Sequence, residues 1–460
     1  MGVFYFIKIG SDRVKDKIVA KFGGSSLAES NQFRKVKKIV KENQERTIIV
    51  PSAPGKRFKK DHKVTDLLYM CHQLASHGLN FEDVFKLVRN RYMDICKDLD
   101  SSIEIQDILE EVFVNIANGA SRDYCASRGE HINARILAAF LDYNFIDSTE
   151  IIRFNHKGKF DAKKTKELIE QNMDRLINSV VPGFYGANEV GEIVCFSRGG
   201  SDITGSILAD AIDAKLYENW TDVSGFLMAD PKLVPNPEQI RSVTYRELRE
   251  LSYMGAPVLH EEAIFPVREK GIPIHIKNTN NPDDMGTLIV PDSWPVDNKN
   301  IITGIAGKKD FTVISVEKTL MNTDKGFLRK IISVFETNDI QIEHMPSSID
   351  SISIIVSDKE LNSKINKVME EINIYCNPDN IVTYPQMSLI AVVGRGMIQT
   401  KGISARVFSA LSENGVNIRM ISQGSSELNI IIGVENKDFE RAISAIYYAF
   451  QNKEDKNEKI

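Results

Sequence analysis

Two glycine-rich turns constrain the fold of this chain most, because each joins an expected strand to an expected helix. The first is KFGGSS at residues 21–26, and the second is SRGGSD at residues 197–202. Paired glycines let main-chain N–H groups approach an anion closely, and the helix that follows adds the positive end of its dipole. A single glycine pair after a strand is more often an ordinary turn. Two such turns, each with a charged residue, instead favour a site that aligns a phosphoryl donor with its acceptor.

Lys21 and Asp202 are the charged residues that we expect to act in these turns. Lys21 supplies a point charge for phosphate oxygens, and Asp202 can position that lysine or a metal ion. The main-chain N–H groups of Gly23 and Gly24 add donors for the same phosphoryl group. We therefore predict that Lys21, Gly23, Gly24 and Asp202 form the catalytic centre of a kinase.

Short apolar strands alternate with longer helical patterns from residue 17 to about residue 290. Strands are expected at residues 17–22, 46–52, 179–186, 192–197, 214–222 and 273–279. Helices are expected at residues 30–44, 63–77, 81–98, 103–118, 129–142, 162–179, 202–211 and 246–254. The alternation predicts an α/β three-layer sandwich with a mainly parallel sheet. Ligands should then bind at the carboxyl ends of the strands, where the glycine turns fall.

A β-α-β-β-α pattern occurs twice after a boundary rich in Pro, Asp and Asn, beginning at Thr312 and again at Ser388. Identical residues recur at one constant offset, in the pairs Met321 and Met397, Lys325 and Lys401, Gly326 and Gly402, and Asn338 and Asn414. Such self-similarity predicts two copies of one βαββαβ, ferredoxin-like module. The second copy lacks a last strand, and we expect the strand at residues 300–307 to complete it. The predicted parts are a catalytic domain at 1–290, a linker at 291–299, a first module at 308–385, a second module at 300–307 with 386–453, and a polar tail at 454–460.

The composition of the chain restricts the kinds of binding partner and the cellular compartment that we expect. A net charge of −5 gives no general basic footprint, so we expect no nucleic-acid partner. The five cysteines are scattered without CxxC spacing, which indicates reduced thiols. No apolar run approaches membrane-spanning length, so we expect a cytoplasmic protein without a membrane partner. The basic run at residues 56–63 is typical of a solvated loop, although its place after a predicted active-site turn leaves open a role in attracting anionic substrates.

Seven strings, taken together, resemble the aspartate kinases of the amino acid kinase family, and the repeats resemble tandem ACT domains. The strings are KFGGSSLA at 21–28, PSAPG at 51–55, SRGE at 127–130, PGFYGA at 182–187, SRGGSDITGS at 197–206, TDVSGFLMADPK at 221–232 and GAPVLHEEAI at 255–264. The resemblance implies transfer of the γ-phosphoryl group of ATP, with Mg²⁺, to the side-chain carboxylate of L-aspartate. The product, 4-phospho-L-aspartate, would feed lysine, threonine and methionine biosynthesis.

The resemblance also assigns substrate-binding residues. Arg198 would clamp the α-carboxylate of aspartate, and Glu130 would meet its α-ammonium group. Ser52, Thr65 and Ser201 would bind the side-chain carboxylate. The nucleotide would contact Lys21, Gly24, Ser25, Thr221, Asp222, Leu227, Asp230 and Lys232.

Several of these residues also have a purely structural interpretation. Glu130 could be a helix-start carboxylate that stabilises the dipole, and Thr65 could be an N-cap. Arg198 could form a structural ion pair, and Asp222 could be an ordinary turn aspartate.

Three departures from the family pattern lie on the nucleotide side. Leu227 stands where the family commonly has tyrosine, Lys232 where it has arginine, and Pro257 where it has lysine. Lysine keeps the charge of arginine but loses its planar fork. We therefore expect altered ATP affinity, with Lys232 or Lys277 compensating, rather than lost catalysis.

The turn at residues 321–328 of the first module resembles the effector-binding turn of ACT domains, and its MxxxxGFL form resembles that of lysine-inhibited aspartate kinases. The predicted lysine-binding residues are Met321, Asp324, Gly326, Phe327, Leu328 and Glu343. A purely structural turn is the alternative, and threonine is the alternative effector.

Two further functions stay open at this point: a non-catalytic amino-acid sensor that retains the kinase fold, and a kinase for another acidic amino acid such as glutamate. Because a small sheet leaves exposed strand edges, we expect the ACT modules to pair between subunits in a homodimer or a dimer of dimers.

Overall fold

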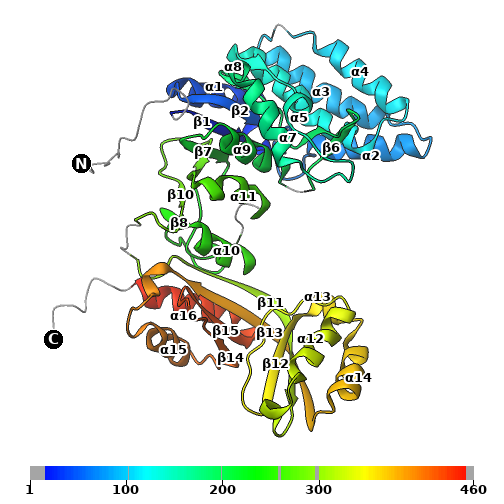
Figure 1. Ribbon diagram of the computed structural model, residues 1–460. Helices are drawn as coiled ribbons and strands as arrows, with labels where there is room; N and C mark the ends of the chain where they lie inside the picture. The colour runs from blue at the N-terminus through cyan, green and yellow to red at the C-terminus, as the bar shows by residue number, and fades with distance from the viewer. Residues whose placement is uncertain (1–15, 102, 198, 257–260, 296–299, 452–460) are drawn as a thin grey trace, which may run out of the picture. The chain divides into compact units, whose positions relative to one another are not determined.

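The computed structural model describes residues 16–101, 103–197, 199–256, 261–295 and 300–451 (Figure 1). Contacts divide the chain into two compact units. The first unit comprises residues 1–226, 241–245 and 259–295, and the second comprises residues 227–240, 246–258 and 296–460. Residues 227–240 and 246–256 thus pack with the second unit, although they lie before the predicted domain boundary at residue 290. The predicted bounds of the modules remain a prediction.

An eight-stranded sheet forms the centre of the first unit, in the order β3-β4-β2-β1-β7-β9-β10-β8. Its strands from β3 to β9 are parallel to their neighbours, whereas β10 is antiparallel to β9 and parallel to β8. The strands are β1 Ile18–Phe22, β2 Arg46–Pro51, β3 Asn144–Phe145, β4 Ser179–Val180, β7 Leu216–Thr221, β8 Ser242–Thr244, β9 Ile274–Asn278 and β10 Thr287–Val290. The α/β class with a mainly parallel sheet is confirmed.

Helices cover both faces of this sheet. On one face, α5 packs on the sheet together with α1, and α2, α3 and α4 join the same apolar cluster. On the other face, α9 packs on β1 and β7, and α7 and α11 lie beside α9. The helices of this unit are α1 Ser30–Glu42, α2 Val64–Ser76, α3 Glu82–Asp98, α4 Ile105–Ala117, α5 Arg122–Leu141, α6 Ser148–Ile151, α7 Ala162–Gln171, α8 Met173–Leu176, α9 Gly200–Ala211 and α11 Glu261–Lys270. α10, Tyr245–Tyr253, belongs to the second unit except for its first residue. Because side chains alternate along a strand, Ala20 and Phe22 enter the α1–α5 core, and Lys21 points to the opposite face.

Two elements differ from the expectation in ways that affect the site. Helix α5 begins at Arg122, capped by the Ser121 hydroxyl, which accepts the Tyr124 N–H, rather than at residue 129. Strand β6, Ile193–Cys195, pairs with β5, Tyr185–Ala187, in a separate two-stranded sheet. The second glycine turn therefore follows this small sheet and not the central one.

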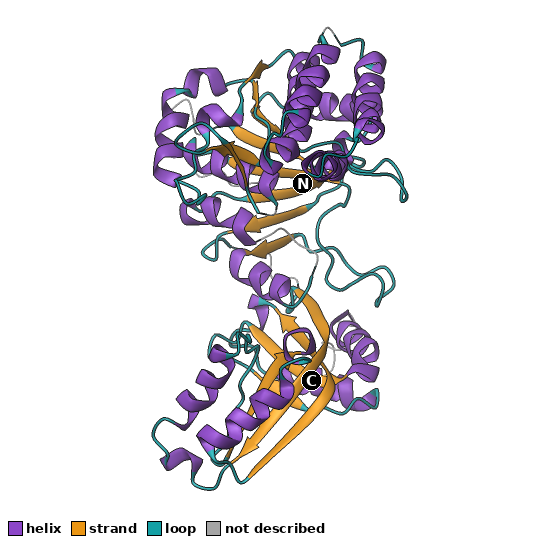
Figure 2. Cartoon of the chain, turned by 90° about the vertical axis from the view of Figure 1, so that its right-hand side faces the viewer, coloured by secondary structure: helices purple, strands orange, loops and turns teal. Residues whose placement is uncertain are grey.

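A single five-stranded sheet, in the order β12-β11-β13-β15-β14, forms the second unit (Figure 2). The strands are β11 Gly304–Glu317, β12 Ser351–Ser357, β13 Asn380–Val393, β14 Met420–Ser422 and β15 Asn429–Glu435. Residues 304–308 pair with 389–393, and residues 311–317 pair with both β12 and the beginning of β13. One long strand with an irregularity after Lys308 thus replaces the two separate strands that the sequence predicted there.

The sequence repeat has matching local structure in the two halves of this unit. Helices α12 and α15 both begin after a left-handed glycine, Gly326 with φ 108° and Gly402 with φ 85°. Asn338 and Asn414 each donate a side-chain N–H to a main-chain carbonyl one turn earlier, both at 2.8 Å. The helices are α12 Phe327–Thr337, α13 Asp358–Leu361, α14 Ile365–Cys376, α15 Ile403–Glu413 and α16 Phe439–Gln451.

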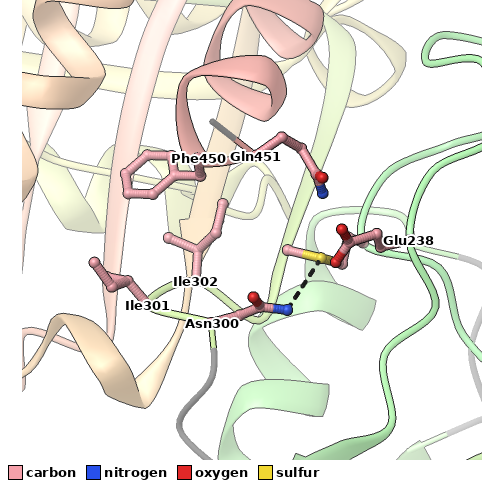
Figure 3. Close-up of a pocket in the computed structure, with 7 residues that line it drawn as sticks. Glu238, Asn300, Ile301, Ile302, Phe450 and Gln451 are labelled. Carbon is pink, nitrogen blue, oxygen red and sulfur yellow. Dashed lines mark hydrogen bonds between the residues drawn. The ribbon is translucent and has the colours of Figure 1, made fainter. Parts of the chain in front are cut away.

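A small hollow lies in the second unit beside the end of α16 (Figure 3). Its walls include Glu238, Ile302 and Phe450, and Asn300 donates its amide to the Met228 sulfur at 3.9 Å. It contains none of the predicted catalytic residues. Within the described residues, no helix is long and apolar enough to cross a membrane.

Candidate active site

Lys21 and Asp202 meet as an ion pair, as their places at the two glycine turns predicted. Lys21 stands near the end of β1 and Asp202 in the first turn of α9, and Lys21 Nζ lies 2.6 Å from Asp202 Oδ1. The two side chains are only 10% and 18% exposed, so water screens the pair weakly. The buried Asn219 on β7 donates its amide to the same oxygen of Asp202 at 2.8 Å.

The glycines of the first turn allow close main-chain packing. A Cβ on Gly24 would lie 2.8 Å from the Ala53 carbonyl oxygen, and the Gly55 N–H donates to the Gly24 carbonyl at 2.8 Å. Gly23 has an extended conformation and donates its N–H to the Trp220 carbonyl at 2.9 Å. The turn is therefore fixed against segment 53–55, and Gly24 has a structural reason to be glycine besides any contact with phosphate.

Glu130 is a buried carboxylate inside α5, and its Oε2 atom has no hydrogen-bond partner. Burial raises the pKa of Glu130 to about 8, although the Ala53 N–H and the charge of Lys21 oppose this shift. Because α5 begins before it, Glu130 is not the helix-start carboxylate that the structural alternative required. A buried carboxyl with an unsatisfied oxygen is suited to receive an ammonium group.

The predicted substrate residues Ser52, Thr65 and Ser201 lie on segments that pack around this centre. The buried Asn133 of α5 donates to the Ser52 carbonyl at 2.7 Å. Thr65 Oγ1 would be 3.6 Å from a Cβ on Gly129, and the N-cap of α2 is Lys63, so Thr65 is not the N-cap.

The segment with the sequence PGFYG packs closely against Ser201. A Cβ on Gly183 would lie 2.6 Å from the Ser201 Cβ and Oγ atoms, so only glycine fits there. Arg198, the predicted clamp of the α-carboxylate, lies outside the described residues, as does Pro257.

The predicted nucleotide residues divide between the two units. In the first unit, Ser25 follows the glycine pair, and the Thr221 hydroxyl donates to Asp222 Oδ1 at 3.2 Å. In the second unit, Leu227 pairs with Gln239 and is 41% exposed, and Asp230 accepts the Lys232 N–H at 2.9 Å. Asp222 therefore has a local hydrogen-bond partner, which agrees with its interpretation as an ordinary turn aspartate. These contacts do not show which of the residues bind the nucleotide.

Lys277, predicted to compensate on the nucleotide side, lies at the end of β9. Its ammonium donates to the Asp284 carbonyl at 2.5 Å and lies 5.6 Å from the centre of the Trp220 ring. Burial lowers the pKa of Lys277.

Sequence reasoning missed Asn219, Asn133 and Gly183, which hold the predicted residues in place. The alternation of β7 carried a signal for Asn219, because an asparagine in a buried parallel strand needs a polar partner. Gly183 lies in the PGFYGA string, but nothing local in the sequence pointed to its contact with Ser201 or to Asn133, because these contacts are distant along the chain.

The predicted effector turn lies in the second unit. Met321 and Phe327 are buried, whereas Leu328 is 43% exposed. Asp324 pairs with Lys318 at 3.5 Å and with Lys330 at 3.8 Å.

Glu343 is engaged rather than solvated. It hydrogen-bonds the hydroxyl of Tyr253 in the same unit, and burial together with this bond raises the pKa of Tyr253 to about 12.

Comparison with known proteins agrees with this architecture. A model of the amino acid kinase family matches residues 16–278, and a model of the ACT domain matches residues 390–450. Aspartokinase 3 of Bacillus subtilis is 38% identical over 449 residues, which cover 94% of this chain and 98% of the relative. The crystal structure of Clostridium acetobutylicum aspartate kinase is 56% identical with a TM-score of 0.89, covering 94% of this chain and all of that one.

The chain therefore belongs to the amino acid kinase family and carries ACT-domain sequence after its kinase region. Within that family it belongs to the aspartate kinases, since its similarity to them extends over nearly its full length. Escherichia coli aspartokinase III in complex with aspartate and ADP shares the fold, with a TM-score of 0.72 at 24% identity and coverage of 95% of this chain.

Proposed function

We propose that the Lys21–Asp202 centre carries the aspartate kinase reaction, the ATP-dependent phosphorylation of the L-aspartate side chain. The single observation that supports these roles best is the 2.6 Å pair between Lys21 and Asp202, close to the Glu130 carboxyl, whose Oε2 atom has no hydrogen-bond partner. An ammonium donor for phosphoryl oxygens and a carboxyl for the substrate ammonium are what this chemistry requires.

The chemical step needs alignment more than proton transfer. An oxygen of the aspartate side-chain carboxylate attacks the γ-phosphorus of ATP, a new P–O bond forms, the bond to the β-phosphate oxygen breaks, and ADP leaves. A carboxylate is already a nucleophile, so no general base is required. Lys21 neutralises charge on the transferring group, Glu130 binds the α-ammonium group, and Arg198 binds the α-carboxylate.

Mg²⁺, when bound with ATP, neutralises charge on the phosphate oxygens. Asp202 is the residue that would hold it, because Lys21 and Asn219 both use Oδ1 and leave Oδ2 for another ligand. Asp202 also keeps Lys21 in place for the phosphoryl group.

The test is ATP-dependent formation of an acyl phosphate, trapped as the hydroxamate, with L-aspartate or L-glutamate as acceptor. Aspartate-dependent product that Lys21→Met abolishes supports the proposal. Product with glutamate alone would reassign the substrate, and no product with either would favour the amino-acid sensor.

We further propose that L-lysine inhibits the enzyme by binding at the turn of residues 321–328. Asp324 and Glu343 offer carboxylates for a ligand that carries two ammonium groups, and both are already held in place by neighbours. Inhibition requires that lysine prefer one conformation of the enzyme. Unchanged activity at millimolar lysine would refute this, and inhibition by threonine alone would reassign the effector.

A homodimer, or a dimer of dimers, through the ACT modules completes the proposal. β14 is an edge strand of the second unit's sheet, whereas residues 343–347 pair with the outer side of β12. An exposed edge favours pairing with another chain. Sedimentation equilibrium measures the state directly, and a monomer at micromolar concentration would contradict it. The cytoplasmic location remains a prediction.

A further inference from the structure

Asn219 occupies a position from which it can control the geometry of the catalytic pair. It stands on β7 directly opposite Lys21 on β1, so the two side chains lie next to each other on the face covered by α9. Its side chain is 3% exposed, and its amide donates to Asp202 Oδ1 at 2.8 Å. Lys21 Nζ lies 2.6 Å from the same oxygen. Two donors from neighbouring strands thus converge on one carboxylate oxygen.

The two donors differ in what they can do during the reaction. The Lys21 ammonium is charged and must turn part of its hydrogen-bonding toward the phosphoryl group. The Asn219 amide is neutral, short and held by a strand, so it keeps its bond to Asp202 throughout. Without it, Asp202 Oδ1 would depend on Lys21 alone, and the carboxylate would hold Lys21 back from the substrate or rotate with it.

We propose that Asn219 is a positioning residue for phosphoryl transfer, which fixes Asp202 so that Lys21 can engage the transferring group. This inference rests on the proposed roles of Lys21 and Asp202. Asn219 touches neither substrate, and its effect passes through the Asp202 carboxylate.

Two substitutions separate this role from simple packing. Asn219→Leu fills the site but removes the donor, whereas Asn219→Ala leaves a space in which a water molecule can donate to Asp202. Loss of the donor predicts a kcat reduced ~10- to 100-fold in Asn219→Leu, with a KM for aspartate within about twofold of the wild-type value. The alanine variant should be less impaired. A packing role predicts the reverse order, because alanine creates the larger cavity.

Tyr217→Phe is the matched control, since Tyr217 lies on the same strand and the same face. Its hydroxyl donates to the Asp202 main-chain carbonyl at 3.1 Å and does not bond the carboxylate. This variant should retain kcat while losing a similar single hydrogen bond. Melting temperatures of all variants show whether each one folds.

The separate effects on kcat and on KM give a readout that distinguishes positioning from a purely structural role. A positioning role lowers kcat and leaves the KM for aspartate within about twofold of the wild-type value, whereas a general distortion of the site would raise that KM as well. A folded Asn219→Leu variant with wild-type kcat would overturn the proposal, as would an alanine variant with a lower kcat than the leucine variant. Absence of acyl phosphate from the wild-type enzyme would refute the proposed function instead.

Discussion

Glu130 shows how a single buried carboxyl can link substrate binding to pH. Its Oε2 atom lacks a partner, and burial raises its pKa to about 8. At neutral pH the free enzyme therefore holds Glu130 mostly protonated, whereas the α-ammonium group of aspartate binds the ionised form. Binding must then release a proton. Affinity for aspartate should increase as pH rises toward 8.

Substitution of Glu130 by Gln tests this linkage, because glutamine keeps the size and removes the charge. The lost charged hydrogen bond should raise the KM for aspartate ~10- to 100-fold. The wild-type KM should fall as pH rises from 6.5 to 8, and that of Glu130→Gln should stay flat over this range. Steady-state kinetics at fixed MgATP measures both. An equal pH dependence in the two enzymes would exclude Glu130 as the titrating group.

The raised pKa of Glu130 also predicts how the stability of the fold depends on pH, and this dependence has the opposite sign to that of the affinity for aspartate. A carboxyl whose pKa is raised on folding stays protonated in the folded state at pH values where the unfolded chain is ionised, so the free energy of unfolding falls as pH rises between about 4.5 and 8. The melting temperature of Glu130→Gln should therefore gain on the wild type as pH increases through this interval. A constant difference between the two would contradict the raised pKa.

At the scale of elements, the basic loop at residues 56–63 is held by a buried ion cluster. Asp61 is 8% exposed and lies 2.7 Å from Arg91 and 2.9 Å from Arg57, and Arg91 also donates to the Gly55 carbonyl at 3.0 Å. The Arg57 hydrogen bond holds the pKa of Asp61 well below its usual range. This cluster ties the loop to the segment that packs against the first glycine turn.

Replacing Asp61 by Ala leaves the Arg91 guanidinium buried without its carboxylate. Removing one partner of a buried pair costs ~3–5 kcal/mol of the free energy of unfolding, which urea denaturation at pH 7 measures. Because the depressed pKa stabilises the fold only above the unfolded value, the difference from wild type should shrink as pH falls below about 4. Asp61→Ala combined with Arg91→Met should recover part of the loss, and no recovery would argue that the site matters only for packing.

The exposed lysines of the same loop are expected to attract the two anionic substrates. Lys56, Lys59 and Lys60 are exposed on a loop that begins directly beside the first glycine turn, on a chain of net charge −5. Changing all three to Gln should lower kcat/KM ~3- to 10-fold at low salt and leave kcat unchanged. The deficit should vanish near 1 M salt, where charges are screened within ~3 Å.

A charge-matched control lies on α7. Lys163, Lys164 and Lys166 are exposed there, and changing all three to Gln should not alter kcat/KM. If the loop variant and the α7 variant respond equally to salt, the effect belongs to the net charge and not to the loop.

For the whole molecule, the sequence predicted the features that local residue patterns encode. It did not predict the features that depend on packing between segments distant along the chain. The strand–helix alternation predicted the α/β sandwich, and the places of Lys21 and Asp202 at the two glycine-rich turns predicted that they meet. The apolar run at residues 192–197 has the composition of a central strand, yet β6 joins a separate sheet, because a pattern does not say which neighbour a strand pairs with. Likewise, the irregularity at Lys309 and Asp310 made one long strand, β11, look like two separate strands in the sequence.

The contacts that hold the site share this limitation. Asn219 and Gly183 matter through Asp202 and Ser201, which adjoin neither of them along the chain. A motif names the groups that perform chemistry, whereas the residues that orient them are recognisable only once the sheet brings them together.

The division into two compact units predicts how ligands stabilise the whole chain. The catalytic pair and Glu130 belong to the first unit, and the proposed lysine turn belongs to the second. Each unit has its own sheet, so calorimetric unfolding should show two transitions. A ligand that binds only the native state stabilises by ~2.7 kcal/mol at 100 times its Kd. Lysine should therefore raise chiefly the transition of the second unit, and aspartate that of the first. One transition that both ligands shift equally would mean that the units unfold together, and regulation would then operate within a single cooperative fold.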